Sequence, residues 1–188
     1  MQTVSSSEFK RGLALMLEGA PQIIDDFYTT GTAQTRHKLH VKLRNLKTGR
    51  ITERVFADNE RVPVAELQTR TVQFSYQQGD TYTFMDTSNY EEMEMPAELV
   101  GERKYFLKEN EECKAQILEG RLLDIVLPLT QSLKIKETAP SQKGGSVASW
   151  KPAILETGLE IMVPLFIGAG ESVRVDTASR KYLGKDNE

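Results

Sequence analysis

Alternation of apolar and polar residues predicts a β-strand in the first third of the chain. Within residues 37–44, Leu39, Val41 and Leu43 alternate with polar or basic positions. Because successive side chains of a strand point to opposite faces, the apolar set is expected to face a core. A second strand is predicted at residues 51–56, after a turn in which Gly49 can supply the positive φ. These two segments predict a β-hairpin.

Similar patterns continue to the end of the chain. A second hairpin is predicted from residues 72–76 and 81–85, and short strands from residues 133–136, 160–163 and 172–176. Helical signals are confined to residues 7–12 and 96–101, and the neighbouring Met93 and Met95 are expected to fill a core. Turn signals recur every ten or so residues, which is typical of small barrels. The pattern therefore predicts an all-β protein.

The spacing of the strands divides the chain into three modules. We place them at residues 1–65, 66–128 and 129–188, about 60 residues each, which is near the lower size limit for an independent core. The modules are therefore expected to support one another. Residues 138–151 are rich in small and polar residues and are expected to form a loop inserted within the third module.

The net charge of −3 conceals an uneven distribution. The three modules carry net charges of +3, −7 and +1, and residues 36–54 hold seven bases and one acid. The seven bases are Arg36, Lys38, Lys42, Arg44, Lys47, Arg50 and Arg54. A local cationic stripe can attract a polyanion although the whole chain is acidic, because salt screens distant charge. A solvated strand face would carry the same charges, and both interpretations stay open.

Composition and termini argue against several classes of protein. The 188 residues contain one cysteine, so the chain can form no internal disulfide and no paired-cysteine metal site. The first residues lack the basic and apolar blocks of a signal peptide, and no apolar run approaches the roughly 20 residues of a membrane helix. We expect a cytoplasmic protein that has no membrane partner.

Candidate catalytic chemistry is sparse. The only histidines, His37 and His40, would point to opposite faces of the predicted strand, so they are not expected to share a metal ion. Cys113 lies in an alternating segment and is expected to be a small buried hydrophobe. The glycines at 168 and 170 lack a third partner and precede a strand-like segment, unlike a dinucleotide-binding loop. We expect no catalytic residues, no metal and no cofactor, and therefore not an enzyme.

The segment before the basic strand is the best candidate for binding. Residues 29–37 are small and polar, which is typical of a hairpin tip that projects from the core. The candidate contacts are Gly31, Thr32, Ala33, Gln34, Thr35 and Arg36 at the tip, with Lys38, Lys42 and Arg44 as a supporting basic face. Arginine can bind a phosphate through two hydrogen bonds and stack on a base. An ordinary surface hairpin remains the alternative.

Several motifs resemble those of a known family. The segments FKRGL at 9–13 and VKLRNLKTG at 41–49 resemble the first domain of bacterial elongation factor P. The segments VQFSY at 72–76 and YTFMD at 82–86 resemble its second domain. The third-domain signature of the family is matched at residues 151–153, 156–158, 163–167, 170–171 and 175–177. The resemblance spans nearly the whole chain.

This resemblance implies a fold and a function. It implies an SH3-like, KOW-type domain followed by two OB-folds, in an L-shaped arrangement that imitates a tRNA. It further implies a monomeric elongation factor that binds the 70S ribosome and contacts peptidyl-tRNA and ribosomal RNA. Such a factor stimulates peptide-bond formation at polyproline sequences by orienting the peptidyl-tRNA and supplies no catalytic group.

The chain departs from the family pattern in two places. The loop position where the family usually has a modified lysine or arginine corresponds to Gln34, and Arg36 lies two residues away. The resemblance thus indicates an unmodified paralogue, or one that uses Arg36 differently. In the third domain, the residues Lys143, Gly144, Gly145 and Ser146 stand where the family's loop approaches the exit-site codon. An RNA-binding regulatory module that has lost the peptidyl-transfer role stays open as the rival hypothesis.

Overall fold

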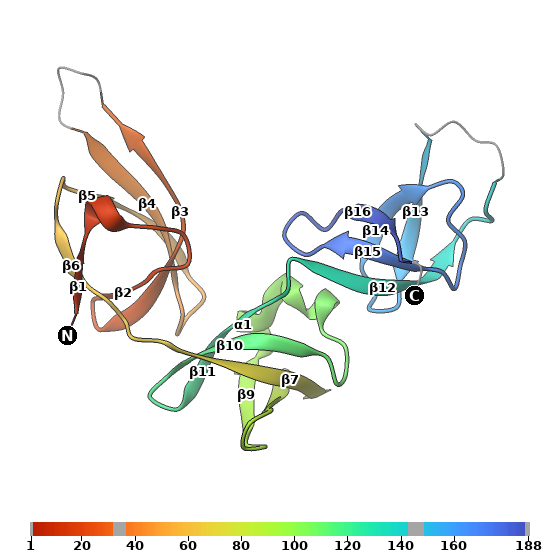
Figure 1. Ribbon diagram of the computed structural model, residues 1–188, viewed down its shortest axis with the longest axis horizontal. Helices are drawn as coiled ribbons and strands as arrows, with labels where there is room; N and C mark the ends of the chain where they lie inside the picture. Colours follow the sequence, from red (N-terminus) through yellow and green to blue (C-terminus); the bar gives the residue numbers. More distant parts are fainter. Residues whose placement is uncertain (1, 32–36, 143–148, 187–188) are drawn as a thin grey trace.

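The protein consists of three β units that follow one another along the chain. The computed structural model describes residues 2–31, 37–142 and 149–186. The N-terminal and C-terminal units flank the central unit, and their outer ends diverge, so that the molecule is bent (Figure 1). The prediction of an all-β chain made of small, curled β units is confirmed, and the three units together contain four sheets.

The N-terminal unit combines two sheets around one core. Its elements are β1 (Thr3–Ser5), η1 (Ser6–Glu8), β2 (Ala14–Leu17), β3 (Ala20–Thr30), β4 (Lys38–Asn45), β5 (Ile51–Phe56) and β6 (Arg61–Pro63). One sheet has the order β2-β3-β4-β5, the other pairs β1 with β6, and a bridge between Leu15 and Val64 links them. Val41 and Leu43 are buried whereas Lys42 is exposed, as the alternation predicts.

The central unit is a five-stranded sheet with a short helical connection. Its elements are β7 (Gln68–Gln78), β8 (Thr81–Asp86), β9 (Glu92–Pro96), α1 (Ala97–Val100), η2 (Gly101–Phe106), β10 (Glu112–Leu118) and β11 (Arg121–Val126). The strand order is β11-β10-β7-β8-β9. Phe84 and Met95 are fully buried in its core, and Cys113 lies there too, as the sequence predicts for Met95 and Cys113. Burial raises the pKa of the Cys113 thiol to about 11, so it remains protonated at neutral pH.

The C-terminal unit repeats the topology of the central unit. Its strands are β12 (Thr130–Thr138), β13 (Trp150–Leu155), β14 (Glu160–Pro164), β15 (Ser172–Asp176) and β16 (Tyr182–Lys185). The order β14-β13-β12-β15-β16 places the first strand in the middle, as in the central unit. The long strand β12 pairs with β15 along its first half and with β13 along its second half, with a register shift between Ile135 and Glu137. Such a shift bends a strand from one side of a barrel to the other.

The loop predicted at residues 138–151 includes residues that belong to a strand. Trp150 and Lys151 belong to β13, and Lys151 is only 5 % exposed. Its ammonium group donates hydrogen bonds to the carbonyl oxygens of Ala139 and Pro140, at 2.5 and 3.2 Å. These contacts explain how a lysine occupies an inward position, because buried ammonium groups need acceptors.

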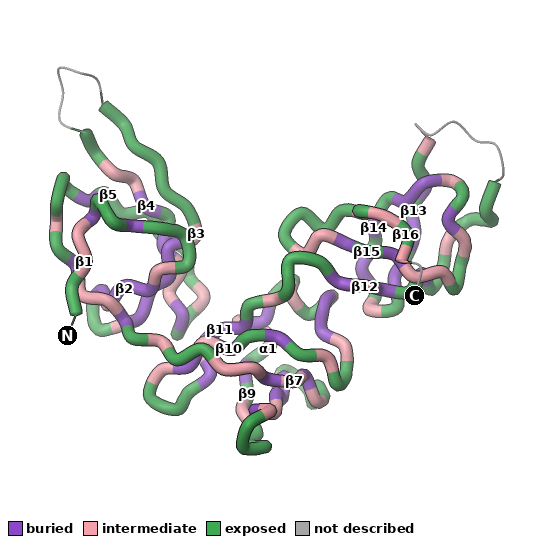
Figure 2. The backbone as a smooth tube through the Cα atoms, in the orientation of Figure 1, coloured by how far each residue is buried: buried purple, intermediate pink, exposed green. Residues whose placement is uncertain are grey.

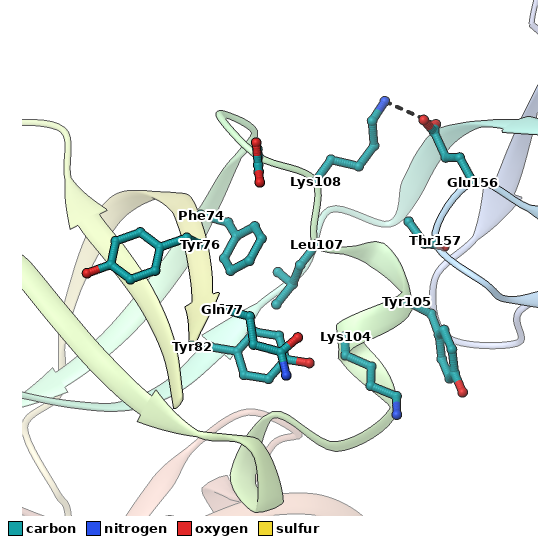
Figure 3. A pocket seen from close by; sticks show the side chains of 11 residues that line it. Phe74, Tyr76, Gln77, Tyr82, Lys104, Tyr105, Leu107, Lys108, Glu156 and Thr157 are labelled. Atoms are coloured by element: carbon teal, nitrogen blue, oxygen red, sulfur yellow. Dashed lines mark ion pairs between the residues drawn. The ribbon is translucent and has the colours of Figure 1, made fainter. Parts of the chain in front are cut away.

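The central and C-terminal units are joined by shared packing. Phe106, at the end of η2, is 3 % exposed and packs in the core of the C-terminal unit. Leu127 contacts the cores of both units. A groove of about 890 Å³ lies beside this junction, and the ion pair between Lys108 and Glu156 spans it at 3.4 Å (Figure 3). The connection between the two units is therefore a packed junction.

The contacts of Asp86 beside the β8–β9 turn make the stability of the fold sensitive to acid. The Asp86 carboxylate accepts hydrogen bonds from the Ser88 hydroxyl and backbone N–H, at 2.6 and 2.8 Å, and it pairs with Arg70 at 3.1 Å. The Ser88 hydrogen bonds, followed by Arg70, lower the pKa of Asp86 below its ordinary value. A lowered pKa stabilises the fold above the ordinary carboxyl pKa, and this contribution is lost as the pH falls through the lowered value.

We expect Asp86→Asn to lower the melting temperature at pH 7 and to flatten the loss of stability below about pH 4. Thermal melts between about pH 2 and about pH 7, a range that includes the ordinary pKa of aspartate, measure how steeply the melting temperature falls with acid. Asp58→Asn serves as the control, because Asp58 is exposed in a loop of the N-terminal unit. An unchanged acid slope in Asp86→Asn would contradict the assignment.

Candidate nucleic-acid interface

The strands β3 and β4 form an arm that extends beyond the N-terminal core. They pair from Gln22 and Asn45 at the base to Thr30 and Lys38 at the far end. Residues 26–30 are all exposed, in contrast to the buried base of β3 (Figure 2). Eight paired positions, with one register shift between Ile24 and Asp26, give the arm a ladder of hydrogen bonds that supports its outer end.

The candidate tip is described only in part. Gly31 is exposed and continues directly from β3. The remaining candidates at the tip, Thr32, Ala33, Gln34, Thr35 and Arg36, lie outside the described residues. The same holds for the candidates in the third-domain loop, Lys143, Gly144, Gly145 and Ser146. For these nine residues the assigned roles stay predictions.

A stacked aromatic pair stiffens the outer face of the arm. Tyr28 and His40 are cross-strand partners whose rings are nearly parallel, with centroids 4.7 Å apart. The His40 ring nitrogens lie 2.9 Å from the Thr30 hydroxyl and 3.1 Å from the Glu53 carboxylate. Partial burial and the Glu53 charge raise the pKa of the Tyr28 phenol, which donates to Glu53 at 3.3 Å. These side chains tie β3, β4 and β5 together just before the tip.

The alternation in β4 places His40 on this face, but the roles of Tyr28 and Glu53 were not predicted. The signal was available in the alternation of β3, where Tyr28 has the same parity as Asp26 and Thr30. The register between β3 and β4, which no local pattern specifies, decides that Tyr28 meets His40. His37 is exposed and precedes β4, so the two histidines do not converge.

Two of the three supporting bases are exposed, and their contact with a ligand stays a prediction. Lys38 and Lys42 are exposed on β4, with the parity of His40. Near the base of this face Arg11 binds Asp26 at 2.5 Å, and this hydrogen bond lowers the pKa of Asp26. Both lysines are therefore available to a ligand that approaches along the outer face of the arm.

Arg44 has a different environment from the one expected for a phosphate contact. Its guanidinium donates to Asp25 in the same unit and to Asp124 in the central unit, at 3.2 Å each. Burial lowers the pKa of Arg44, but the charges and hydrogen bonds of Asp124 and Asp25 outweigh this effect and raise it. With its donors directed at two carboxylates, Arg44 joins two units instead of extending the basic face.

Asp124 is the centre of this contact between units. Its side chain is only 2 % exposed, and it pairs with Arg103 as well as with Arg44. Arg103 also donates to the carbonyl oxygens of Leu99 and Ile125, at 2.5 and 2.6 Å. Two guanidinium groups on one carboxylate compensate the cost of burying its charge.

The turn between β4 and β5 completes the contact. Gly49 adopts a φ of +72°, and a Cβ atom at this position would lie 3.1 Å from a methyl group of Leu99. Glycine is favoured here for two reasons, because the backbone is left-handed and the neighbouring unit is close. The turn that the sequence predicts as the end of a hairpin is also a docking point for the central unit.

The described residues present no site for a metal ion. No group of three or more histidine, cysteine or acidic side chains converges within residues 2–31, 37–142 and 149–186. Over the same ranges, no helix has the length and apolar character that crossing a bilayer requires. The features that characterise the arm are its exposed bases and the stacked rings of Tyr28 and His40.

Fold and arm together define a class of protein. The chain is a modular β protein in which an SH3-like unit with a projecting hairpin precedes two OB-type barrels, a barrel class that often binds nucleic acids. Comparison with known protein families gives a match in each of the three units. Residues 5–62 match the elongation factor P KOW-like domain, residues 67–125 the elongation factor P OB domain, and residues 132–185 the elongation factor P C-terminal domain.

Full-length relatives extend this agreement. The chain is 39 % identical over 183 residues to elongation factor P of Desulfovibrio desulfuricans, covering 97 % of this chain and 99 % of the relative. It is 37 % identical over 185 residues to elongation factor P of a Synechocystis species, covering 98 % of this chain and 99 % of the relative. The chain belongs to the elongation factor P family, and it is a translation factor.

A solved structure shares part of the fold. Eukaryotic translation initiation factor 5A from Methanococcus jannaschii aligns with a TM-score of 0.52 at 23 % identity, covering 66 % of this chain and 92 % of that protein. The resemblance stated from the sequence motifs is thus confirmed at the level of the family and the fold.

Proposed function

We propose that this protein binds the ribosome beside the peptidyl-tRNA and stimulates peptide-bond formation at consecutive prolines. The observation that carries the proposal is the match of all three units to elongation factor P, in chain order, in a molecule with a stiff and exposed arm. The central and C-terminal units serve as docking barrels, and their bent arrangement with the N-terminal unit imitates the shape of a tRNA.

In this proposal the arm acts by positioning. The tip at residues 31–36 braces the acceptor end of the peptidyl-tRNA, while Lys38 and Lys42 contact phosphates behind it. The ribosome's own centre carries out the chemistry, and the factor supplies no catalytic group. Holding the reacting ends in an attacking geometry removes an entropic part of the barrier.

The proposed setting follows from the same role. The protein acts as a monomer in the cytoplasm, and its partners are the 70S ribosome, the peptidyl-tRNA and ribosomal RNA. Arg44 is excluded from the proposed RNA contacts because it binds Asp25 and Asp124. It contributes by holding the unit that carries the arm against the central unit.

Arg36→Ala is expected to slow the rescue of polyproline-stalled translation several-fold and to leave the melting temperature nearly unchanged. The reason is that the substitution removes a guanidinium that can bind phosphate in a bidentate manner. A reconstituted translation assay measures the rate. Arg121→Ala is the matched control, because Arg121 is an exposed arginine at the start of β11, far along the chain from the arm. Equal rescue by Arg36→Ala and the unsubstituted protein would remove Arg36 from its role.

We further propose that the tip acts without modification, because Gln34 has neither an amine nor a guanidinium. The intact mass of the natively expressed protein is expected to equal that of the unmodified chain, near 21.2 kDa. An adduct located within residues 31–38 would contradict this expectation.

A titration separates this function from that of a general RNA-binding module. The protein is expected to bind 70S ribosomes that hold a peptidyl-tRNA far more tightly than it binds free tRNA. A general cationic binder would show little preference and a steep loss of affinity with salt. Equal affinities for the two would favour the general module.

A further inference from the structure

The C-terminal unit carries an exposed aromatic surface that the proposed function does not use. We propose that this surface binds single-stranded RNA by stacking a base on Trp150 and holding the adjacent phosphate with Lys181. We call it the Trp150 face, and it consists of Trp150, Glu160, Met162, Arg180, Lys181 and Tyr182.

The geometry suits the stacking of a base. The Trp150 side chain is 48 % exposed although its ring packs edge-to-face on Tyr182, with centroids 5.9 Å apart. Tyr182 thus holds the indole in place while about half of its surface stays open. Met162 is 51 % exposed beside it, and the residues of the face line a hollow of about 610 Å³. A held, half-open indole can accept a flat base with little loss of side-chain freedom.

The position of the face in the fold points to the same class of ligand. β13 and β14 are the second and third strands of a five-stranded OB barrel, and Arg180 and Lys181 end the connection between the fourth and fifth strands. In Figure 1, β13, β14 and β16 lie together in this unit. OB barrels bind oligonucleotides on the surface made by strands two and three and by the loop between strands four and five.

One cation of the face, Lys181, is available to a phosphate. Lys181 is exposed and forms no ion pair with any described residue, so its ammonium group is free to contact a phosphate. Arg180 is held at 2.5 Å by Glu102 of the central unit, and Glu160 is the one acid of the face. An open indole beside an available lysine matches the pairing of base and phosphate in a single strand.

The central unit provides an internal comparison. It has the same strand order, and its corresponding strands are β8 and β9. Along β8 and β9, Met85 pairs with Glu92 and Thr83 with Glu94, and the exposed members of these pairs are the two glutamates. Along β13 and β14, Trp150 pairs with Pro164 and Pro152 with Met162, and the exposed members are Trp150, Pro152 and Met162. The same topology therefore presents carboxylates in one unit and an aromatic surface in the other, so the Trp150 face is a property of the residues and not of the fold.

Tryptophan fluorescence tests the proposal directly, because Trp150 is the only tryptophan of the chain. The full-length protein is titrated with a single-stranded oligoadenylate of about six nucleotides, and in parallel with a duplex held closed as the stem of an RNA hairpin. The single strand is expected to quench the fluorescence in a saturable manner. The duplex, whose bases are already stacked, is expected to quench it at least about tenfold more weakly.

Variants assign the binding to individual side chains, with anisotropy of a labelled oligoadenylate as the readout. Trp150→Ala is expected to weaken binding about tenfold or more, Trp150→Phe to retain most of the affinity, and Lys181→Glu to weaken it. Phe166→Ala is the matched control, because Phe166 is 57 % exposed in the same unit but lies outside the Trp150 face. Circular dichroism melts establish that each variant is folded.

Three results would overturn the proposal. They are equal affinity of Trp150→Ala and the unsubstituted protein, equal binding of duplex and single strand, or quenching by RNA-free ribosomal proteins but not by the oligonucleotide. The last result would identify a protein as the occupant. The assay contains no ribosome, so its failure leaves the proposed function untouched, and a failure of polyproline rescue leaves this binding result untouched.

Discussion

Asp124→Ala is expected to lower the free energy of unfolding by about 3–5 kcal/mol, the range for removing one partner of a buried ion pair. Asp124 is 2 % exposed and lies between the guanidinium groups of Arg44 and Arg103. Without it, two arginines of adjacent units face each other with no carboxylate between them. Urea unfolding of the full chain, followed by circular dichroism, measures the change.

The same substitution tests the role of the contact between units. Because Arg44 is the side chain that reaches Asp124 from the N-terminal unit, the loss should also widen the distribution of angles between the N-terminal and central units. Small-angle scattering is expected to show a larger radius of gyration. Asp80→Ala is the control, because Asp80 is exposed in the turn before β8. Unchanged stability and unchanged scattering in Asp124→Ala would contradict the assigned role.

Phe106→Ala is expected to destabilise the C-terminal unit by about 3–5 kcal/mol, as is typical when a buried phenylalanine is truncated. Phe106 belongs to the helical segment of the central unit, yet it packs in the core of the C-terminal unit. The substitution would leave a cavity in that core and remove one of the side chains that join the two units. Trp150 fluorescence reports the unfolding of the C-terminal unit specifically, because Trp150 lies on β13.

A comparison of two variants sharpens this test. Phe106→Leu keeps most of the apolar volume and is expected to cost far less than Phe106→Ala. Tyr90→Ala removes an aromatic ring that is 72 % exposed in a turn, and it is expected to change stability by less than about 0.5 kcal/mol. Equal melting curves for Phe106→Ala and Tyr90→Ala would show that the junction does not hold the C-terminal unit.

Local patterns predict those parts of the fold that depend on neighbours in sequence. Val41 and Leu43 are buried because a strand with one face on a core requires alternation, and this period is visible in the residues themselves. Met95 was expected in a core because of its apolar and flexible side chain, and it is buried in the central unit. The turn at Gly49 was predictable from its glycine, but the contact with Leu99 was not, because the two residues come from different units.

Contacts that no local pattern specifies account for the residues whose observed environment differs from the predicted one. Arg44 has the parity of Lys42, so alternation assigns both to one face, whereas Asp25 and the docked central unit give Arg44 a different environment. Lys151 was assigned to a loop because residues 138–151 are rich in small and polar residues, whereas the carbonyl oxygens of Ala139 and Pro140 allow it to point inward. In each case the deciding partner is distant in sequence or belongs to the backbone.

The central claim is that an exposed arm, held on a docked N-terminal unit, helps the ribosome to join consecutive prolines. The most direct measurement is the rate of triproline synthesis in a translation system reconstituted from purified components, with and without this protein. We predict a clear acceleration with the unsubstituted protein and a much smaller one with Arg36→Ala. A rate that does not respond to saturating protein, on ribosomes shown to bind it, would contradict the account.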